Sequence, residues 1–201
     1  KLMSAGKRVL TGESLFMTAF TNTGQGKKRV SFASPYTGKI IKFDLSMLGG
    51  KIIAQKDAFL CSAKGVSIGI EFQRRLGTGI FGGEGFIMQK LEGDGLAFAH
   101  AGGYVVEKEL KPGEVLKVDT GCVVAYTPNV DFNVEMVRGI KNFMFGGEGL
   151  FFAKLTGPGH VWLQSLPISR LAGRIMQYGT YKRKEEGGVL GGLGNLLDGR
   201  E

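Results

Sequence analysis

The chain has 201 residues, a formal net charge of +8 and 43% hydrophobic residues, which is ordinary for a globular protein of one or two domains. Its 34 glycines make up about 17% of the chain, against roughly 7% on average, and this predicts many tight turns between short strands. No apolar run reaches about 18 residues, so no membrane-spanning helix is expected. Two cysteines, Cys61 and Cys122, exclude a disulfide framework and favour a reducing compartment, so we predict a cytoplasmic protein.

Residues 1–35 are expected to form the back half of a first β-unit. Residues 12–17 read GESLFM, and a glycine turn and the run VSFAS (Val30–Ser34) follow. Later units hold about 45 residues before the corresponding Gly-Glu pair, whereas this one holds 11. By this arithmetic, roughly 35 residues of the first unit are expected upstream of Lys1.

The segments 36–101 and 102–167 are two copies of one unit. FGGEGFIMQKLEGDGLAFAHA, beginning at Phe81, aligns without a gap with FGGEGLFFAKLTGPGHVWLQS, beginning at Phe145. Runs such as YVVEKEL, VLKVD and CVVAY are rich in β-branched and aromatic residues and end at turn residues, which indicates short strands. The EGDG and TGPG turns lie between apolar runs and predict a β-hairpin in each copy. We therefore predict an all-β fold of three repeated units.

The remaining chain changes its pattern. In SLPISRLAGRIMQYG, Ser169 is a possible helix cap, and the spacing of Leu171, Ile175 and Met176 predicts a short C-terminal helix over 168–179. Residues 180–201 are charged and glycine-rich, a composition typical of a flexible tail. The scattered leucines of GGVLGGLGNLL leave open a contact of this tail with a membrane or a neighbouring chain.

The stretch GTGIFGGEG (Gly77–Gly85) contains the pattern G-x-G-x-x-G of dinucleotide-binding loops. That site needs a helix after the glycines, whereas FIMQKLEGDGLAFAHA predicts a strand, a turn and a strand. The third unit keeps GGEG but lacks the first two glycines, as a structural turn would and a phosphate loop would not. We predict no nucleotide cofactor, and no other cofactor.

A Gly-Glu signature recurs in all three units. Its glutamates, Glu13, Glu84 and Glu148, are equivalent in the repeat, so they can form a ring of carboxylates or accept hydrogen bonds within their own turns. We favour the structural role and predict no metal site, because no histidine or further acidic residue recurs beside them. The glycines of the signature are Gly12, Gly83, Gly85, Gly147 and Gly149.

The sequence contains no catalytic signature. His100 and His160 are not equivalent in the repeat, and each is expected to be exposed or hydrogen-bonded in an alternating strand. No G-x-S-x-G, H-E-x-x-H or C-x-x-C motif is present. A Cys–His dyad that involves Cys61 or Cys122 stays open, since dyads assemble in space.

Basic residues form the candidate binding site. Lys27, Lys28 and Arg29 follow the first glycine turn, and Arg74 and Arg75 form a second cluster, both placed to contact phosphates. Solvated loops are the alternative interpretation, because the nearby aromatic residues alternate as core residues do.

Three motifs point to a family: LTGESLF (Leu10–Phe16), the FGGEG strings, and LKPGEVLKVDTGCVVAY (Leu110–Tyr126). Together they resemble the bacterial and archaeal relatives of the yeast altered-inheritance-of-mitochondria protein, over residues 8 to 180. This resemblance implies three β-units about a pseudo-threefold axis, a fold like that of the tryptophan RNA-binding attenuation protein. It also implies cytosolic bacterial members and a mitochondrial inner-membrane role in the eukaryotic branch. It brings no catalytic residues.

Three hypotheses of function follow. The first is a non-enzymatic β-repeat scaffold or interaction protein, assembled as a homo-oligomer because β-units must cover their strand edges. The second is a module that binds a polyanion, either nucleic acid or an anionic membrane surface, through its basic loops. The third is an enzyme with a spatially assembled site. We favour the first, and we infer no small-molecule substrate.

Overall fold

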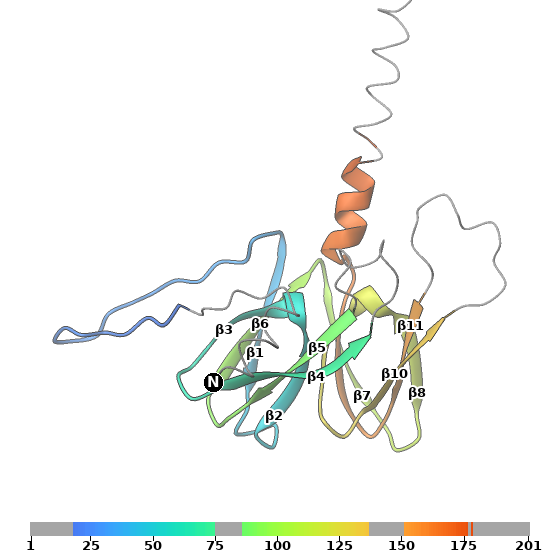
Figure 1. Ribbon diagram of the computed structural model, residues 1–201, viewed down its shortest axis with the longest axis horizontal. Helices are drawn as coiled ribbons and strands as arrows, with labels where there is room; N and C mark the ends of the chain where they lie inside the picture. The colour runs from blue at the N-terminus through green and yellow to red at the C-terminus, as the bar shows by residue number, and fades with distance from the viewer. Residues whose placement is uncertain (1–17, 75–85, 137–150, 177, 179–201) are drawn as a thin grey trace, which may run out of the picture. The chain divides into compact units, whose positions relative to one another are not determined.

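The computed structural model describes residues 18–74, 86–136, 151–176 and 178 (Figure 1). The predicted all-β class is confirmed, with one short helix over residues 168–176. The first set of strands is β1 (Gly38–Asp44), β2 (Lys51–Gln55), β3 (Phe59–Ser62), β4 (Ser67–Arg74), β5 (Phe86–Glu92) and β6 (Leu96–Gly102). The second set is β7 (Val105–Leu110), β8 (Val115–Asp119), β9 (Val123–Tyr126), β10 (Asp131–Met136), β11 (Phe151–Thr156) and β12 (Gly159–Gln164).

The two sets of strands follow the same plan. The strands β2, β3 and β4 begin at Lys51, Phe59 and Ser67, and β8, β9 and β10 begin at Val115, Val123 and Asp131. Each strand of the second set thus begins as far after its counterpart as Phe145 lies after Phe81 in the sequence repeat. A single 3-10 turn follows β2 (η1, Lys56–Ala58) and β8 (η3, Thr120–Cys122). The side chains of Gln55 and Asp119 cap these turns, each accepting a hydrogen bond from a backbone N–H two residues later, at 2.9 Å. The equivalent strands β2 and β8 therefore both end in a 3-10 turn that is capped by the side chain just before it.

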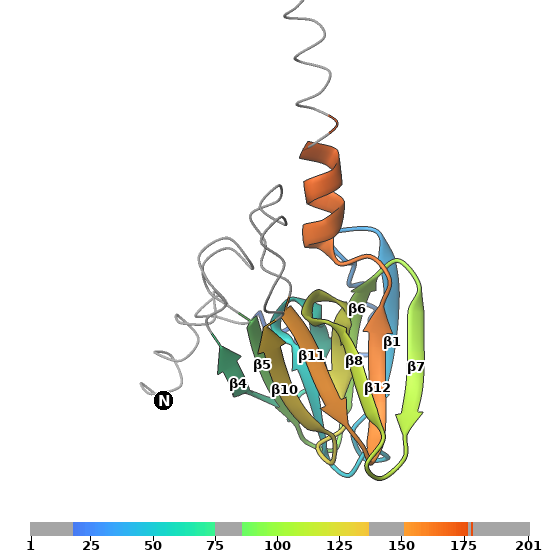
Figure 2. The same ribbon diagram turned by 90° about the vertical axis from the view of Figure 1, so that its right-hand side faces the viewer.

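The strands form three antiparallel sheets. Two sheets have three strands, in the orders β1-β6-β3 and β10-β11-β8, and the third has six, in the order β4-β5-β2-β9-β12-β7. The six-stranded sheet joins three strands of each set through the pairing of β2 with β9, so the two sets lie side by side (Figures 1 and 2).

The middle of the six-stranded sheet is buried on both faces. Ile52 and Ala54 point to one hydrophobic core, shared with the β1-β6-β3 sheet, whereas Ile53 points to a second core, shared with the β10-β11-β8 sheet. This two-sided burial explains why consecutive residues are apolar where these strands lie between the two cores, at Ile52–Ala54 in β2, Phe86–Met88 in β5 and Val123–Tyr126 in β9.

The EGDG and TGPG turns do not form hairpins, which corrects the prediction. β5 pairs with β4 and β2, whereas β6 pairs with β1 and β3, so the Glu92–Gly95 turn carries the chain between two sheets. The Gly93 N–H donates to the Gly50 carbonyl at 3.0 Å, and the Leu45 N–H donates to the Gly95 carbonyl at 3.2 Å. The glycines let this turn lie against the β1–β2 turn instead of closing on itself.

The first-unit strand expected at Val30–Ser34 is not formed. Residues 18–37 contain no strand, although the glycine turn is present, with the Asn22 side-chain amide donating to the Gly26 carbonyl at 2.8 Å. Phe20 and Phe32 meet edge to face across this segment, with ring centroids 5.5 Å apart. Within the described residues no strand pairs with it, so its backbone has no ladder to join. The threefold arrangement of units stays a prediction.

The C-terminal helix belongs to a separate unit, since the chain divides after Leu166. Pro167 precedes the helix, and its carbonyl accepts hydrogen bonds from the N–H groups of Arg170 and Leu171 at 3.0 and 3.2 Å. The predicted cap, Ser169, lies inside the helix instead. Proline is favoured at this end, because it has no N–H to lose. In the part of the chain that the structure describes, no helix is long and apolar enough to cross a membrane.

Candidate functional site

The junction between β2 and β9 is the place where the two sets of strands become one sheet. Ile53 lies opposite Tyr126, and Ala54 lies opposite Ala125. All four side chains are at most 3% exposed. Burial raises the pKa of the Tyr126 hydroxyl, with smaller contributions from the carboxylates of Glu71 and Asp131, so this hydroxyl stays protonated.

A second contact crosses the same junction. Trp162 on β12 belongs to the core of the first set of strands and packs edge to face against Phe43 on β1, with ring centroids 5.0 Å apart. Its neighbour Val161 points to the other core. The strand β12 thus places one side chain in each core, and the aromatic pair binds the two sets together.

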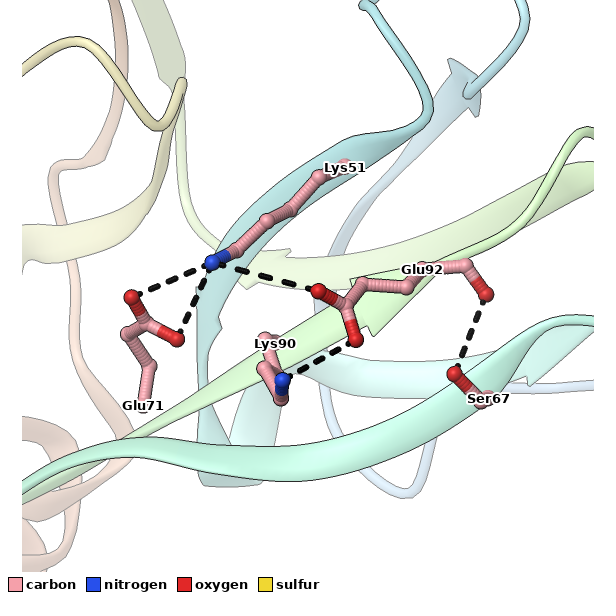
Figure 3. Close-up of polar contacts among 5 residues, drawn as sticks. All are labelled: Lys51, Ser67, Glu71, Lys90 and Glu92. Carbon is pink, nitrogen blue, oxygen red and sulfur yellow. Dashed lines mark hydrogen bonds and ion pairs between the residues drawn. The ribbon is translucent and has the colours of Figure 1, made fainter.

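Charged residues on β2, β4 and β5 form a network on the same face of the sheet as Ile53 (Figure 3). The Lys51 ammonium lies 3.1 Å from both carboxylate oxygens of Glu71 and 4.0 Å from Glu92. Lys90 pairs with Glu92 at 3.0 Å, and the Ser67 hydroxyl donates to the Glu92 backbone carbonyl at 3.3 Å. Each charge has an opposite partner, so this network links three neighbouring strands at the surface of the sheet.

The second set of strands repeats part of this network. Lys117 on β8 pairs with Glu135 on β10 at 2.7 Å, and Glu135 is the repeat equivalent of Glu71. The hydrogen bond from Lys117 is the main cause that lowers the pKa of the Glu135 carboxyl. However, Lys117 takes the position of buried Ile53 rather than that of Lys51. Lys117 is exposed, whereas the equivalent Ile53 is buried where β2 pairs with β9. Among the described residues, no strand covers the edge of β8 in the same way.

Six strands end a sheet and keep one unpaired edge among the described residues, and β3 and β8 are two of them. β3 pairs only with β6, and β8 pairs only with β11. These are the strands that correspond to β9 and β2, the pair that forms the internal junction. An unpaired edge presents a row of backbone N–H and C=O groups that can bind another strand. The edges of β3 and β8 are therefore the candidate functional site.

The predicted basic site is only partly described. Lys27, Lys28 and Arg29 are exposed in the strand-free segment of residues 18–37. The backbone of Arg74 ends β4, and Arg75 lies outside the described residues. The Gly-Glu signature also lies outside the described residues: Gly12, Glu13, Gly83, Glu84, Gly85, Gly147, Glu148 and Gly149.

The buried histidine of β6 differs from the prediction. His100 is 3% exposed, and neither ring nitrogen makes a hydrogen bond to a described residue. The Tyr36 ring covers it edge to face at 4.3 Å. Burial lowers the pKa of His100, and the nearby Tyr36 backbone offsets part of that shift. The signal for burial is the strand LAFAHA, which is apolar on both faces.

His160 and Cys61 are two further residues that the sequence left open for catalysis. The His160 ring lies 3.5 Å from the Glu107 carboxylate at the surface. Burial raises the pKa of the Cys61 thiol, opposite to the shift that a nucleophilic cysteine needs. Across the described ranges, no group of three or more His, Cys, Asp or Glu side chains is arranged to hold a metal ion.

Residues 1–166 match the family model described as mitochondrial biogenesis AIM24. The chain belongs to the AIM24 family. The resemblance found in the sequence is therefore confirmed. One AIM24 relative is an uncharacterised protein of Streptococcus pyogenes serotype M6, 30% identical over 182 residues, which cover 89% of this chain and 70% of that protein.

A crystal structure of a Streptococcus pyogenes protein is similar to this AIM24 chain, with a TM-score of 0.60 and 25% sequence identity. The match covers 73% of this chain and 62% of the streptococcal one, so the chain spans less than two thirds of that structure.

Proposed function

We propose that this AIM24 protein is a non-enzymatic β-repeat scaffold that binds other polypeptide chains, including copies of itself, through the edges of its sheets. One observation carries the proposal. The pairing of β2 with β9 extends a sheet from one set of strands to the next, and the equivalent edges on β8 and β3 are unpaired among the described residues. Adding a strand to an open edge is a common mode of polypeptide recognition.

Self-association tests this proposal. We expect light scattering or sedimentation velocity at micromolar concentration to give a mass of at least two chains, with dissociation on dilution. A mass of one chain across that range would contradict the proposed homo-oligomer.

The absence of catalysis is part of the proposal. It is supported by the internally paired charges beside the junction and by the raised pKa of the Cys61 thiol. We also place the protein in the cytoplasm, where a reducing environment keeps Cys61 and Cys122 out of disulfides.

A second candidate function is the binding of a polyanion, nucleic acid or an anionic membrane surface. The observation that favours it is the exposure of three consecutive cations, Lys27, Lys28 and Arg29, in a chain of net charge +8. Retention on heparin should fall steeply as salt rises, and replacing all three with alanine should weaken it. Retention that does not respond to salt would exclude this function.

A further inference from the structure

The C-terminal helix at residues 168–176 is amphipathic, and its apolar face is exposed. Ile168, Leu171, Ile175 and Tyr178 recur at intervals of three and four residues, which places them on one face of a helix. Ile175 is 62% exposed and Tyr178 is 81% exposed, and Leu171 alone among the four is half-buried. Exposed apolar side chains gathered on one face indicate a binding surface.

The opposite face of this helix is basic. Arg170 and Arg174 fall on it about one turn apart, and both are exposed. Over residues 167–184 the sequence contains five cationic residues and no acidic one. A helix with one apolar and one cationic face fits the boundary between lipid headgroups and acyl chains, because the apolar side chains enter the bilayer while the cations meet anionic headgroups.

Two further residues widen the apolar face. At about 100° per residue, Ala172 and Met176 extend it to about 160° of the helix circumference. A coiled coil with a second helix uses a narrower stripe, formed only by the residues at alternating intervals of three and four. A helix shorter than about 12 residues is marginal in water alone, and crossing a bilayer takes about 20 apolar residues. A helix of this length is therefore best stabilised by lying along an apolar surface.

The helix lies outside the repeat. It follows β12, whereas the equivalent strand β6 is followed directly by β7. From Pro167 on, the chain also forms a unit of its own. The repeat therefore assigns no strand of any unit, a first unit included, to the apolar face of this helix.

We propose that this helix binds the surface of an anionic phospholipid bilayer, with Ile168, Leu171 and Ile175 at the acyl boundary and with Arg170 and Arg174 at the headgroups. The inference goes beyond the proposed scaffold function, because it states where the scaffold is held. It also uses a different part of the chain from the three consecutive cations of the second candidate function. The charge of the helix selects an anionic surface, and its apolar face supplies the binding energy.

Sedimentation of the full chain with lipid vesicles tests the apolar face. We expect the protein to bind vesicles of equal parts phosphatidylglycerol and phosphatidylcholine, and to bind vesicles of phosphatidylcholine alone much more weakly. Ile175→Ser should weaken binding to the mixed vesicles about tenfold or more, because the isoleucine side chain no longer enters the apolar phase. Met47→Ser, at a turn residue that is 82% exposed, is the matched control and should leave binding unchanged. Equal binding by the two variants would overturn the proposal.

Replacing Arg170 and Arg174 together with glutamine tests the cationic face. Loss of two cations should weaken binding to the mixed vesicles about tenfold or more, and binding of the wild type should fall as salt rises. Replacing Lys27, Lys28 and Arg29 with alanine should weaken vesicle binding less than this. If that triple variant loses binding while the helix variants bind as the wild type does, the helix is not the membrane site and only the second candidate function stands.

Measurements without vesicles distinguish other partners of the apolar face. Ile175→Ser should leave the mass by light scattering and the free energy of unfolding unchanged, because the side chain is exposed. A lower mass would show that a second copy covers this face, a lower unfolding free energy would show that the chain itself covers it, and either result would overturn the proposal. A wild type that self-associates but binds no mixed vesicles would overturn it and leave the scaffold function standing. A monomer that binds them would overturn only the self-association.

Discussion

The imidazole of His100 is buried, and its ring nitrogens make no hydrogen bond to a described residue. The ring is enclosed by Tyr36 and by the backbone around Gly38, where a Cβ atom would collide with the Ala101 carbonyl oxygen and with His100 Nε2. Glycine at this position is therefore required by close approach. Because burial removes the charged imidazole from water, the folded state favours the neutral ring and the pKa of His100 is lowered.

His100 predicts a dependence of stability on pH. Above about pH 6.5 the histidine is neutral in both the folded and the unfolded chain. Below that pH the unfolded chain takes up a proton that the folded chain resists, because its pKa is lowered, so the free energy of unfolding falls as the pH falls. Urea unfolding at a series of pH values should show this fall in the wild type and a smaller one in His100→Gln. His160→Gln, at the surface, is the control, and an equal slope in all three proteins would show that His100 is not the cause.

At the scale of elements, one junction combines backbone pairing and side-chain packing. β2 and β9 join their sheets, and Phe43 covers Trp162 on the adjacent strand β12. Lys51, Glu71 and Glu92 lie at the surface of the same sheet and contribute little stability, since ion pairs of this exposure gain at most about 1 kcal/mol. The apolar contacts therefore hold the junction.

Phe43→Ala tests this element. Phe43 is 1% exposed, so removal of its ring should cost about 3–5 kcal/mol of unfolding free energy through lost burial and a cavity. Trp162 is the sole tryptophan of the chain, so its fluorescence emission should shift to the red as its cover is lost. Met47→Ala, at an exposed turn, should change neither quantity. A loss below about 1 kcal/mol would contradict the packing described.

At the scale of the whole compact unit before Pro167, the shared six-stranded sheet makes the two sets of strands depend on each other. β2 and β5 contribute side chains to both cores, and so does β9. Neither core can open without exposing one face of the same sheet. We therefore expect the two sets to unfold together.

The equivalent residues Leu91 and Leu155 test this cooperativity. Both are fully buried, one in each core. Leu91→Ala and Leu155→Ala should each lower the unfolding free energy by about 2–5 kcal/mol and shift the same single transition. Far-UV circular dichroism and Trp162 fluorescence should give coincident curves. Two separate transitions in either variant would show that the sets unfold independently.

The sequence by itself determined most of the strands, their repetition at a fixed interval and the family, because apolar runs and turn residues act locally and recur in register. The run at Val30–Ser34 is the exception, since no strand forms there. It did not determine which strands pair. EGDG has the residues of a hairpin, yet hydrogen bonds from a neighbouring turn make it a link between sheets. His100 is buried because Tyr36, which is distant in the sequence, folds over it. Pairing and cover are non-local contacts, so only the tertiary structure decided the two cores, the junction of β2 with β9 and the edges left unpaired among the described residues.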